Sequence, residues 1–509
     1  MSSSKLDVAV PQEELGLQED DDRQAALLGR PRRLFLLGIL VLSVFVDVLA
    51  SSAFFIFTGP IAVDLSIVFE QQSWVITSYA VTFASFLPFW GRVSDIFSPK
   101  PVFCIGFMAV GISNIVLSFL NDKISFFVIR ALSGIAAASL VPTSYRLIAQ
   151  IFSATPEERA WAYTIYGMTG SIANVTGTII AGLIDYIPNG GQMRSWRWFF
   201  RIVAAVSLPC AVCGHTLIPK PHASATPSSA RKKINVELIQ RLDPIGICTM
   251  LSAIILIILG LTLGASYGWT YAGFLVPFIL GVILLPAFFF WESRLPDEHA
   301  LLPPSIWRIQ NVTVLVVFAL ITLGWWSVNF IPFVEMFTQV HGERTILAAV
   351  RTLPEGVSAG IVSVILITNP QLIARPRYPI YAAMCLCVAA YAIWCQAPSV
   401  VGTSYWRYVF PGMIIGSGGM QVVLLSTNVG IMLAAPPERT GIVGAILQMS
   451  MQTSSVVALS IQAGLISIHP DGIHDLRNVH ASWYFEMGWT ALWLVGFIVF
   501  YRPVVEKHL

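Results

Sequence analysis

Charged residues are scarce in this chain of 509 residues, because Asp, Glu, Lys and Arg together make up 11% of it. A soluble domain of similar size carries about 25% charged residues. Hydrophobic residues make up 56%, and the mean hydropathy is +0.73. This balance excludes a soluble globular protein and predicts an integral membrane protein in a lipid bilayer. The formal net charge of +2 gives no sign of nucleic-acid binding.

Several motifs that carry chemistry are missing from the chain. It contains no HExxH metalloprotease motif, no GxSxG nucleophile motif and no Walker A phosphate loop. The seven cysteines lie in or beside apolar runs, and Cys210-x-x-Cys213 has no second pair nearby. We therefore expect no enzyme, no metal, no cofactor and no direct use of ATP. No cleavable leader is expected either, because residues 1–33 are polar and the first apolar run follows them.

Apolar runs recur along the rest of the chain, each near the ~20 residues that cross a bilayer as a helix. We therefore expect an all-α polytopic membrane protein with fourteen spans. They are placed at 34–59, 74–91, 101–120, 125–149, 161–183, 196–218, 244–266, 271–291, 311–337, 345–368, 379–397, 404–434, 441–468 and 482–501.

The distribution of basic residues predicts the orientation of these spans. With both chain ends on the inner side, the inner segments hold twenty Lys and Arg residues, and the outer loops hold Lys123, Arg194, Arg344 and Arg477. Cytoplasmic loops carry the excess of Lys and Arg in membrane proteins. Both termini are therefore expected in the cytoplasm, in the cell membrane or alternatively in a vacuolar membrane.

Two short repeats relate the two halves of the chain. Glu158-Arg159 recurs as Glu438-Arg439, and Ala181-Gly182-Leu183-Ile184 recurs 282 positions later. Repeated halves that rock about a central site are the usual basis of alternating access. The expected organisation is a cytoplasmic tail, a six-helix bundle, a linker rich in Pro, Ser and Ala, two added helices, a second six-helix bundle and a final tail: 1–33, 34–218, 219–243, 244–291, 292–501 and 502–509.

Asp47 lies midway along the first expected span, between apolar residues on both sides. Charges inside spans are costly and by default indicate a site that faces a cavity. A buried carboxyl group close to a cation can load and release a proton as access alternates. The alternative is a structural polar contact with a neighbouring helix.

The stretch from Trp74 to Lys100 begins with seventeen uncharged residues and ends in a charged turn that contains Gly91, Arg92 and Asp95. Gly91 allows two helix ends to approach closely. Asp95 can pair with Arg92 or Lys100, or with the dipole of a neighbouring helix. Such a pair can act as a latch that releases when two bundles rock.

This turn resembles the signature loop of the major facilitator superfamily, which Gly91, Asp95 and Lys100 match. In span 4, Arg130 and Gly134 are similar to the family's Arg-x-x-x-Gly pattern, and the resemblance implies that Arg130 couples to the proton. A spacing of four also places Gly134 on the same helix face as Arg130.

Two further motifs resemble the fourteen-span drug:proton antiporter branch (DHA2), in its fungal form. The branch's span-5 antiporter motif is matched by a stripe of small residues that includes Gly170, Gly177 and Gly182, although close helix packing alone would also explain the stripe. Ser195-Trp196-Arg197-Trp198 is similar to the branch's signature in span 6. From their physical character, these tryptophans are expected to be interfacial anchors.

Other polar and aromatic residues inside the spans are candidates for a substrate cavity: Asn174, Asn329, Trp326, Gln421 and Gln448. Together these features predict a proton-coupled antiporter for efflux of a drug or secondary metabolite, of the kind that gives multidrug resistance. Alternatives are a proton-coupled importer, a vacuolar transporter, or a transport-dead sensor. The expected partners are the small-molecule substrate, the proton and the lipid, with the chain as a monomer.

Overall fold

The computed structural model describes residues 29–68, 71–72, 74–153, 155–184, 187, 193–219, 242–297, 299–374, 376–469 and 471–502. Most of the predicted tails and most of the predicted linker lie outside these ranges, and residues 30–33 of the predicted N-terminal tail are helical. Within them the chain is helical and contains no strand. The expectation of an all-α fold is confirmed. In the absence of water, a spanning helix satisfies every backbone polar group within one segment.

The helices follow one another with short connections. They are α2 (Arg30–Asp64), α3 (Trp74–Ile96), α4 (Pro99–Leu117), α5 (Lys123–Ala137), α6 (Leu140–Ile151), α7 (Pro156–Ile184), α8 (Ser195–Leu217), α10 (Pro244–Tyr267), α11 (Ala272–Glu292), α12 (Val312–Phe318), α13 (Thr322–Glu335), α14 (Thr345–Thr368), α15 (Pro370–Ala374), α16 (Arg377–Trp394), α17 (Phe410–Ala434), α18 (Thr440–Ile466) and α19 (Leu476–Phe500).

The fourteen predicted spans all have a helical counterpart in the described residues. By length and composition, 13 of these segments are candidates to cross a membrane. The remaining segment, α3, has 23 residues and carries Arg92 and Asp95 near its end. Two spans are composite, since α5 and α6 together form Lys123–Ile151 and α12 and α13 lie within Val312–Val340. The prediction of a multi-pass membrane protein is confirmed.

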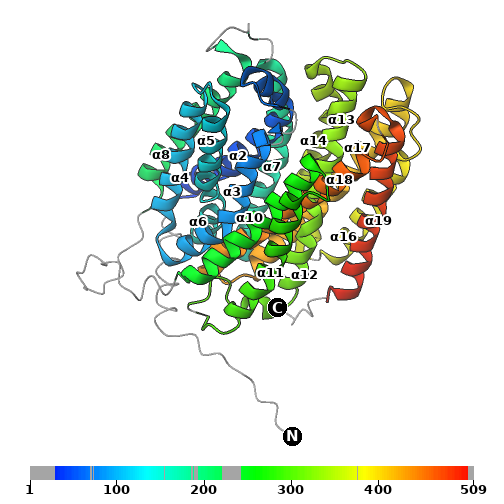
Figure 1. Cartoon of the computed structure of the whole chain (residues 1–509). Helices are drawn as coiled ribbons and strands as arrows, with labels where there is room; N and C mark the ends of the chain where they lie inside the picture. The colour runs from blue at the N-terminus through cyan, green and yellow to red at the C-terminus, as the bar shows by residue number, and fades with distance from the viewer. Residues whose placement is uncertain are drawn as a thin grey trace, which may run out of the picture.

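The spans form two groups that stand side by side (Figure 1). Helices α2 to α8 make up the first group, and α12 to α19 make up the second. Within the first group α2 packs on α7 and α4 on α8, and within the second α16 packs on α17 and α13 on α18. Contacts between the groups run through α3 with α18, α6 with α18, and α7 with α14 and α17. The space between the groups is therefore bounded by helices of both.

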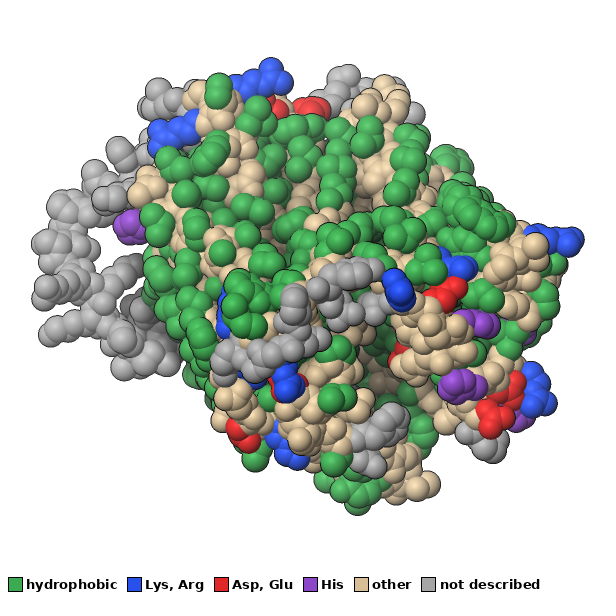
Figure 2. Space-filling view, turned by 90° about the horizontal axis from the view of Figure 1, so that it is seen from above, with side chains coloured by type: hydrophobic (Ala, Val, Ile, Leu, Met, Phe, Trp, Pro, Cys, Tyr) green, Lys and Arg blue, Asp and Glu red, His purple; other side chains and the backbone are tan. Residues whose placement is uncertain are grey.

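Helices α10 and α11 form an added pair that packs mainly on itself. α10 also contacts α3 of the first group and α18 of the second. In Figure 1 the pair lies in front of the boundary between the groups. Viewed from above, hydrophobic side chains cover much of the visible surface, and charged side chains lie among them, mostly toward the right and the lower part of the face (Figure 2). Along the flanks, large apolar side chains such as Val276, Ile283 and Phe290 of α11 are exposed, as suits a chain that is embedded in lipid.

Candidate functional site

A cavity of about 190 Å³ lies between the two groups of helices. Its walls come from α2, α6 and α7 on one side, and from α13, α14, α17 and α18 on the other. Serine, asparagine and glutamine side chains line it together with aromatic rings. Ligand sites are commonly concave and largely apolar, with a few placed polar groups. This cavity is therefore the candidate functional site.

Asp47 lines this cavity from the middle of α2, where its side chain is buried. The hydroxyl group of Tyr79 on α3 donates a hydrogen bond of 2.5 Å to Asp47 Oδ1. The carboxyl group of Asp47 therefore accepts a hydrogen bond from Tyr79 and also borders the cavity. A buried acid with this access can exchange a proton with whatever the cavity contains.

Arg130 lies behind Asp47, on α5. Its guanidinium group lies over the ring of Phe54 at 3.6 Å from the centroid, and 5.0 Å from the centroid of Tyr79. Its Nε donates to the backbone oxygen of Val75 at 3.3 Å. Among the described residues Arg130 forms no ion pair with Asp47 within 4.0 Å. Tyr79 contacts both residues and thus links the buried cation to the buried acid.

Four of the five predicted cavity residues lie at the cavity or beside it. Asn174, Trp326 and Gln448 line the cavity. Gln421 is fully buried beside it, where it accepts a hydrogen bond from Ser171 at 2.7 Å and donates to Ser363.

The prediction for Asn329 is wrong, since this side chain donates to Trp325 O and to the hydroxyl of Tyr391 inside the second group and does not line the cavity. Ser327 lines the cavity, and Asn329 lies two positions later, which is a rotation of about 200° around the helix. The Asn329 side chain therefore leaves the helix on nearly the opposite face from Ser327.

Glu355 is a lining residue that the sequence analysis did not single out. It lies near the middle of α14 and is 3% exposed. An acid in the middle of an apolar span is the same signal that pointed to Asp47, and it would have identified Glu355 as well. The cavity therefore contains two acids, one from each group of helices.

The three glycines of the predicted span-5 motif have different surroundings. A Cβ atom added at Gly177 would lie 2.5 Å from the backbone oxygen of Leu49 on α2. One added at Gly182 would lie 3.0 Å from Ile346 of α14, and one at Gly170 would meet nothing closer than 3.7 Å. Close packing thus accounts for Gly177, whereas Gly170 borders the cavity.

The charged end of α3 contacts the start of α18. Both carboxyl oxygens of Asp95 accept hydrogen bonds from backbone amides, those of Gly441 at 3.1 Å and Ile442 at 2.9 Å. Arg146 of α6 lies 4.0 Å from the same carboxylate and donates to Pro437 O. A carboxylate at a helix N-terminus is stabilised by the free amides and by the helix dipole. Of the three partners considered for Asp95, the N-terminus of the neighbouring helix supplies the hydrogen bonds, and Arg92 also interacts electrostatically with the carboxylate.

The other residues of the predicted latch lie around this contact. Gly91 allows the close approach, since a Cβ atom there would lie 2.7 Å from Ala445 Cβ. Arg92 is buried one turn before Asp95. The Lys100 Nζ donates to the backbone oxygen of Ile218 at the end of α8, within the first group. This observed bond of Lys100 therefore lies inside one group, whereas those of Asp95 join the two groups.

The Ser195-Trp196-Arg197-Trp198 string lies where α2, α4 and α8 meet. Trp196 Nε1 donates to Asp64 Oδ2 at 3.1 Å, and Arg197 donates to the backbone oxygen of Ser118 at 3.0 Å. Trp196 is 1% exposed. The interpretation as an interfacial anchor is wrong for Trp196, because its ring packs among helices and its N–H is used in an internal bond.

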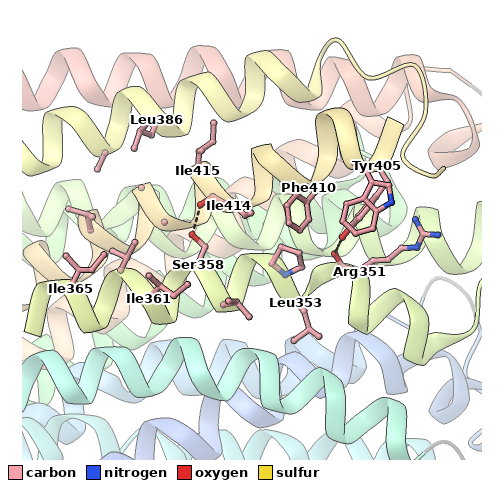
Figure 3. Close-up of a pocket in the computed structure, with 18 of the residues that line it drawn as sticks. Arg351, Leu353, Ser358, Ile361, Ile365, Leu386, Tyr405, Phe410, Ile414 and Ile415 are labelled. Carbon is pink, nitrogen blue, oxygen red and sulfur yellow. Dashed lines mark hydrogen bonds between the residues drawn. The ribbon is translucent and has the colours of Figure 1, made fainter. Parts of the chain in front are cut away.

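A second hollow of about 1260 Å³ lies on the flank of the second group, between α14, α16 and α17. Figure 3 shows its apolar lining, with Ile361, Ile365 and Leu386 along it and Arg351 at one end. Ile361 and Ile365 are largely exposed. None of the residues that line it is acidic. It is larger than the central cavity, but it has the character of a lipid-facing groove and not of a coupling site.

Comparison with known proteins agrees with this fold. The sequence profile of the Major Facilitator Superfamily matches residues 40–247. The structure of the proton:xylose symporter XylE, a protein of that superfamily, superposes with a TM-score of 0.61 at 12% identity, over 94% of this chain and 97% of the other. The chain is thus similar to the major facilitator superfamily in sequence over residues 40–247 and in fold over most of its length.

Two curated relatives of this chain cover most of its length. The puromycin resistance protein pur8 of Streptomyces alboniger is 25% identical over 455 residues, 89% of this chain and 84% of its own. The multidrug transporter mfsC of Aspergillus fumigatus is 23% identical over 84% of this chain and 78% of its own.

The central cavity is bordered on both sides by contacts between the two groups of helices. On one side are the bonds of Asp95 to α18. On the other side, Gly182 of α7 lies against Ile346 of α14, and the rings of Phe55 and Phe330 lie 5.7 Å apart. A site closed in this way shields its contents from bulk water.

Proposed function

We propose that this protein is a secondary active transporter that exports a small organic molecule in exchange for protons. The observation that carries the proposal is the buried carboxyl group of Asp47, which lines a cavity between two groups of helices. The names of the two relatives, a puromycin resistance protein and a multidrug transporter, support export of drug-like compounds. The absence of a recognisable phosphate loop supports the proton as the energy source.

In this proposal the bundles 34–218 and 292–501 move as units about the cavity, and the pair 244–291 is added between them. Protonation of Asp47 changes the relative stability of the two end states, because a proton bound more tightly in one state shifts the population toward it. Arg130 and Tyr79 hold the carboxyl group in place. Asp95 and Gly91 stabilise the state that is closed at the inner end. The glycines of α7 allow close contact with α2 and α14.

The proposal includes a monomer in the cell membrane with both termini in the cytoplasm and no enzymatic activity. The alternative direction is proton-coupled import, which the structural likeness to the proton:xylose symporter XylE supports. A vacuolar membrane is the alternative location. A transport-dead sensor is less well supported, since the loops between the described spans are too short for a signalling domain.

The direction of transport is tested with inside-out vesicles that have an acidic lumen. An antiporter for export concentrates its substrate in the lumen as protons leave. A symporter drives the substrate out of the lumen together with protons. Candidate substrates come from metabolite profiling of cells and medium in a strain without its own pumps. Failure to move any tested compound under an imposed pH gradient contradicts proton-driven transport.

A further inference from the structure

Two buried carboxyl groups face each other at one end of the added helix pair. Asp243 directly precedes α10 and is 4% exposed, and Glu292 is the last residue of α11 and is 2% exposed. A Cβ atom added at Gly246, in the first turn of α10, would clash with both Asp243 Oδ2 and Glu292 Oε1. The two side chains are hydrogen-bonded to each other. The glycine therefore leaves the space in which the two acids meet.

The other hydrogen bonds of the two acids show where a proton is needed. Trp291 Nε1 donates to Asp243 Oδ1 at 3.1 Å. The backbone amides of Leu301 and Leu302 donate to the two oxygens of Glu292 at 3.3 and 3.0 Å. Asp243 Oδ2 has no donor among the described residues. Ionised carboxyl groups can only accept hydrogen bonds. The contact between Asp243 and Glu292 therefore requires one proton between them.

The backbone of Asp243 is held in an unusual conformation. Its φ and ψ of 46° and 72° lie in the left-handed region, and its neighbour Pro244 begins α10. This region costs a residue with a side chain roughly 1–2 kcal/mol, and Asp and Asn tolerate it best. Such strain persists only where the surrounding structure fixes it. The chain thus accepts strain at the residue that brings the two acids together.

The charges around the two acids balance when the pair holds one proton. In this part of the described chain four acids face three arginines, so one shared proton makes the group neutral. Arg294, in the loop after α11, lies over the ring of Phe290 instead. The same loop carries His299, and α18 itself has no charged residue. The acids are Asp95, Asp243, Glu292 and Asp297, and the arginines are Arg92 on α3, Arg146 on α6 and Arg439 before α18.

We propose that Asp243 and Glu292 form a proton-binding site, and that the bound proton fastens the loop between α11 and α12 to the start of α10. The site is separate from the central cavity, whose lining includes neither residue. The inference rests on the proposed function for its orientation, which places the pair on the cytoplasmic side. When the pair releases its proton to water, two carboxylates remain side by side in a buried place. Their repulsion and their desolvation are both unfavourable.

The loop connects this pair to the closure at the start of α18. Glu292 binds two amides of the loop, and Arg439 contacts Asp297 at 3.5 Å and donates to Ser305 at 2.7 Å. Arg439 directly precedes α18, whose first amides bind Asp95. The proton-bound pair stabilises the closed state at low pH, and this stability is lost as the pH on that side rises. An exporter that admits protons is thereby slowed when the cytoplasm is acidic.

The first test measures hydrogen exchange of the loop by mass spectrometry, with the purified full chain in detergent. Protection is compared at about pH 5.5 and about pH 8.5, after correction for the intrinsic rate of amide exchange. We expect protection of residues 293–305 to fall about tenfold or more over this range. The reason is linkage, since a closed loop that holds one more proton than the open loop loses about tenfold in its closing equilibrium per pH unit.

The variant Asp243→Asn separates the proton from the shape of the contact. The Asn amide donates to Glu292 at any pH and tolerates the same left-handed backbone. We expect this variant to keep the protection seen at low pH at both pH values. Glu292→Gln also removes the titration, and a loop that no longer responds to pH in this variant supports the proposal if Asp243→Asn fails to fold. Glu157→Gln, at an exposed site in the first turn of α7, is the matched control and should behave as the wild type does.

The second test asks whether the pair affects the closure, without substrate or a pH gradient. Spin labels at the exposed positions Phe35 and Leu433 report the separation of the two groups by pulsed electron resonance. The open population should rise with pH in the wild type and stay constant in Asp243→Asn. Asp47→Asn should keep the response, because Asp47 lies in the central cavity and not in this pair.

Loop protection that does not change with pH in the wild type overturns the inference, as does the same fall in a folded Asp243→Asn chain. Loss of the spin-label response in Asp47→Asn overturns the link to the closure. These results leave the proposed function intact if vesicles still export a compound against its gradient. A loop that responds to pH without any proton-driven transport has the opposite meaning. It supports the proton-binding pair and contradicts the proposed function.

Discussion

The hydroxyl group of Tyr79 donates a hydrogen bond of 2.5 Å to the carboxyl group of Asp47, and the same tyrosine ring lies 5.0 Å from the guanidinium carbon of Arg130. One aromatic side chain on α3 thus contacts the acid on α2 and the cation on α5. The acid and the cation are kept close without forming a direct ion pair. This arrangement leaves the carboxyl group free to take up a proton from the cavity.

Replacement of Asp47 by Asn should abolish proton-driven transport while the protein still inserts and folds. The amide keeps the shape of the side chain but does not titrate, so binding of a proton no longer shifts the balance between the end states. The measurement is uptake by inside-out vesicles with an acidic lumen. Asp122→Asn is a matched control, because Asp122 caps α5 at an exposed site and Asn is as good a cap. Uphill transport by Asp47→Asn would show that the proton binds elsewhere.

Replacement of Tyr79 by Phe removes one hydrogen bond to Asp47 and preserves the ring over Arg130. Hydrogen bonds to charged groups contribute about 1.5–3 kcal/mol, which corresponds to roughly a tenfold or larger change in an equilibrium. We expect the rate of proton-driven transport to fall about tenfold in the same vesicle assay. Tyr378→Phe, at a side chain that is 71% exposed, should have no effect. A wild-type rate for Tyr79→Phe would mean that the bond has no part in coupling.

Replacement of Asp95 by Ala should weaken the closure at the start of α18. Two charge-assisted bonds to the amides of Gly441 and Ile442 are lost, a change of about 2–3 kcal/mol or more. The state that is open at this end should gain population. Spin labels at the exposed positions Phe35 and Leu433 report the separation of the two groups by pulsed electron resonance.

Asp95→Asn is the matched control for this measurement, since the amide oxygen still accepts one backbone bond. We expect its distance distribution to lie between those of the wild-type and Asp95→Ala chains. Identical distributions for all three chains would show that the carboxylate does not hold the groups together.

The substitutions Gly177→Ala and Gly170→Ala distinguish packing from cavity effects in α7. At Gly177 the new methyl group would lie 2.5 Å from Leu49 O, so α2 and α7 must move apart. Overpacking of this kind costs about 1–3 kcal/mol. We expect a lower melting temperature in detergent for Gly177→Ala and an unchanged one for Gly170→Ala, where the nearest atom is 3.7 Å away. A similar loss of stability for both variants would contradict this account of the stripe.

The pattern of spans could be predicted directly from the sequence, and so could the charged residues inside them, Asp47 and Arg130. Runs of about 20 apolar residues need no tertiary information. Asp47 stands out because an ionisable side chain inside an apolar span needs a polar partner or access to a cavity. The contact partner of Asp95 required the fold, since Arg92 and Lys100 are near in sequence while Gly441 is 346 residues away.

The position of Glu355 could have been predicted from the sequence, but its surroundings could not. Arg351 and Glu355 are four residues apart, a spacing that favours an ion pair on one helix. In the structure Arg351 pairs with Glu343 in the preceding loop instead, and the acid is left without a cation. Asn329 shows the converse, because a polar residue in a span does not indicate which face of the helix meets the cavity.

The contact of α10 with both groups has a mechanical consequence. The buried side chains of α10 include Met250, Ala253, Ile254 and Ile258, none of which forms hydrogen bonds. Apolar contacts are non-directional and have no fixed register. If α3 and α18 separate, they can slide along such a surface in small steps without breaking a specific bond at each one. The added helices would then cover the boundary between the two groups and keep lipid tails out of it while the groups move.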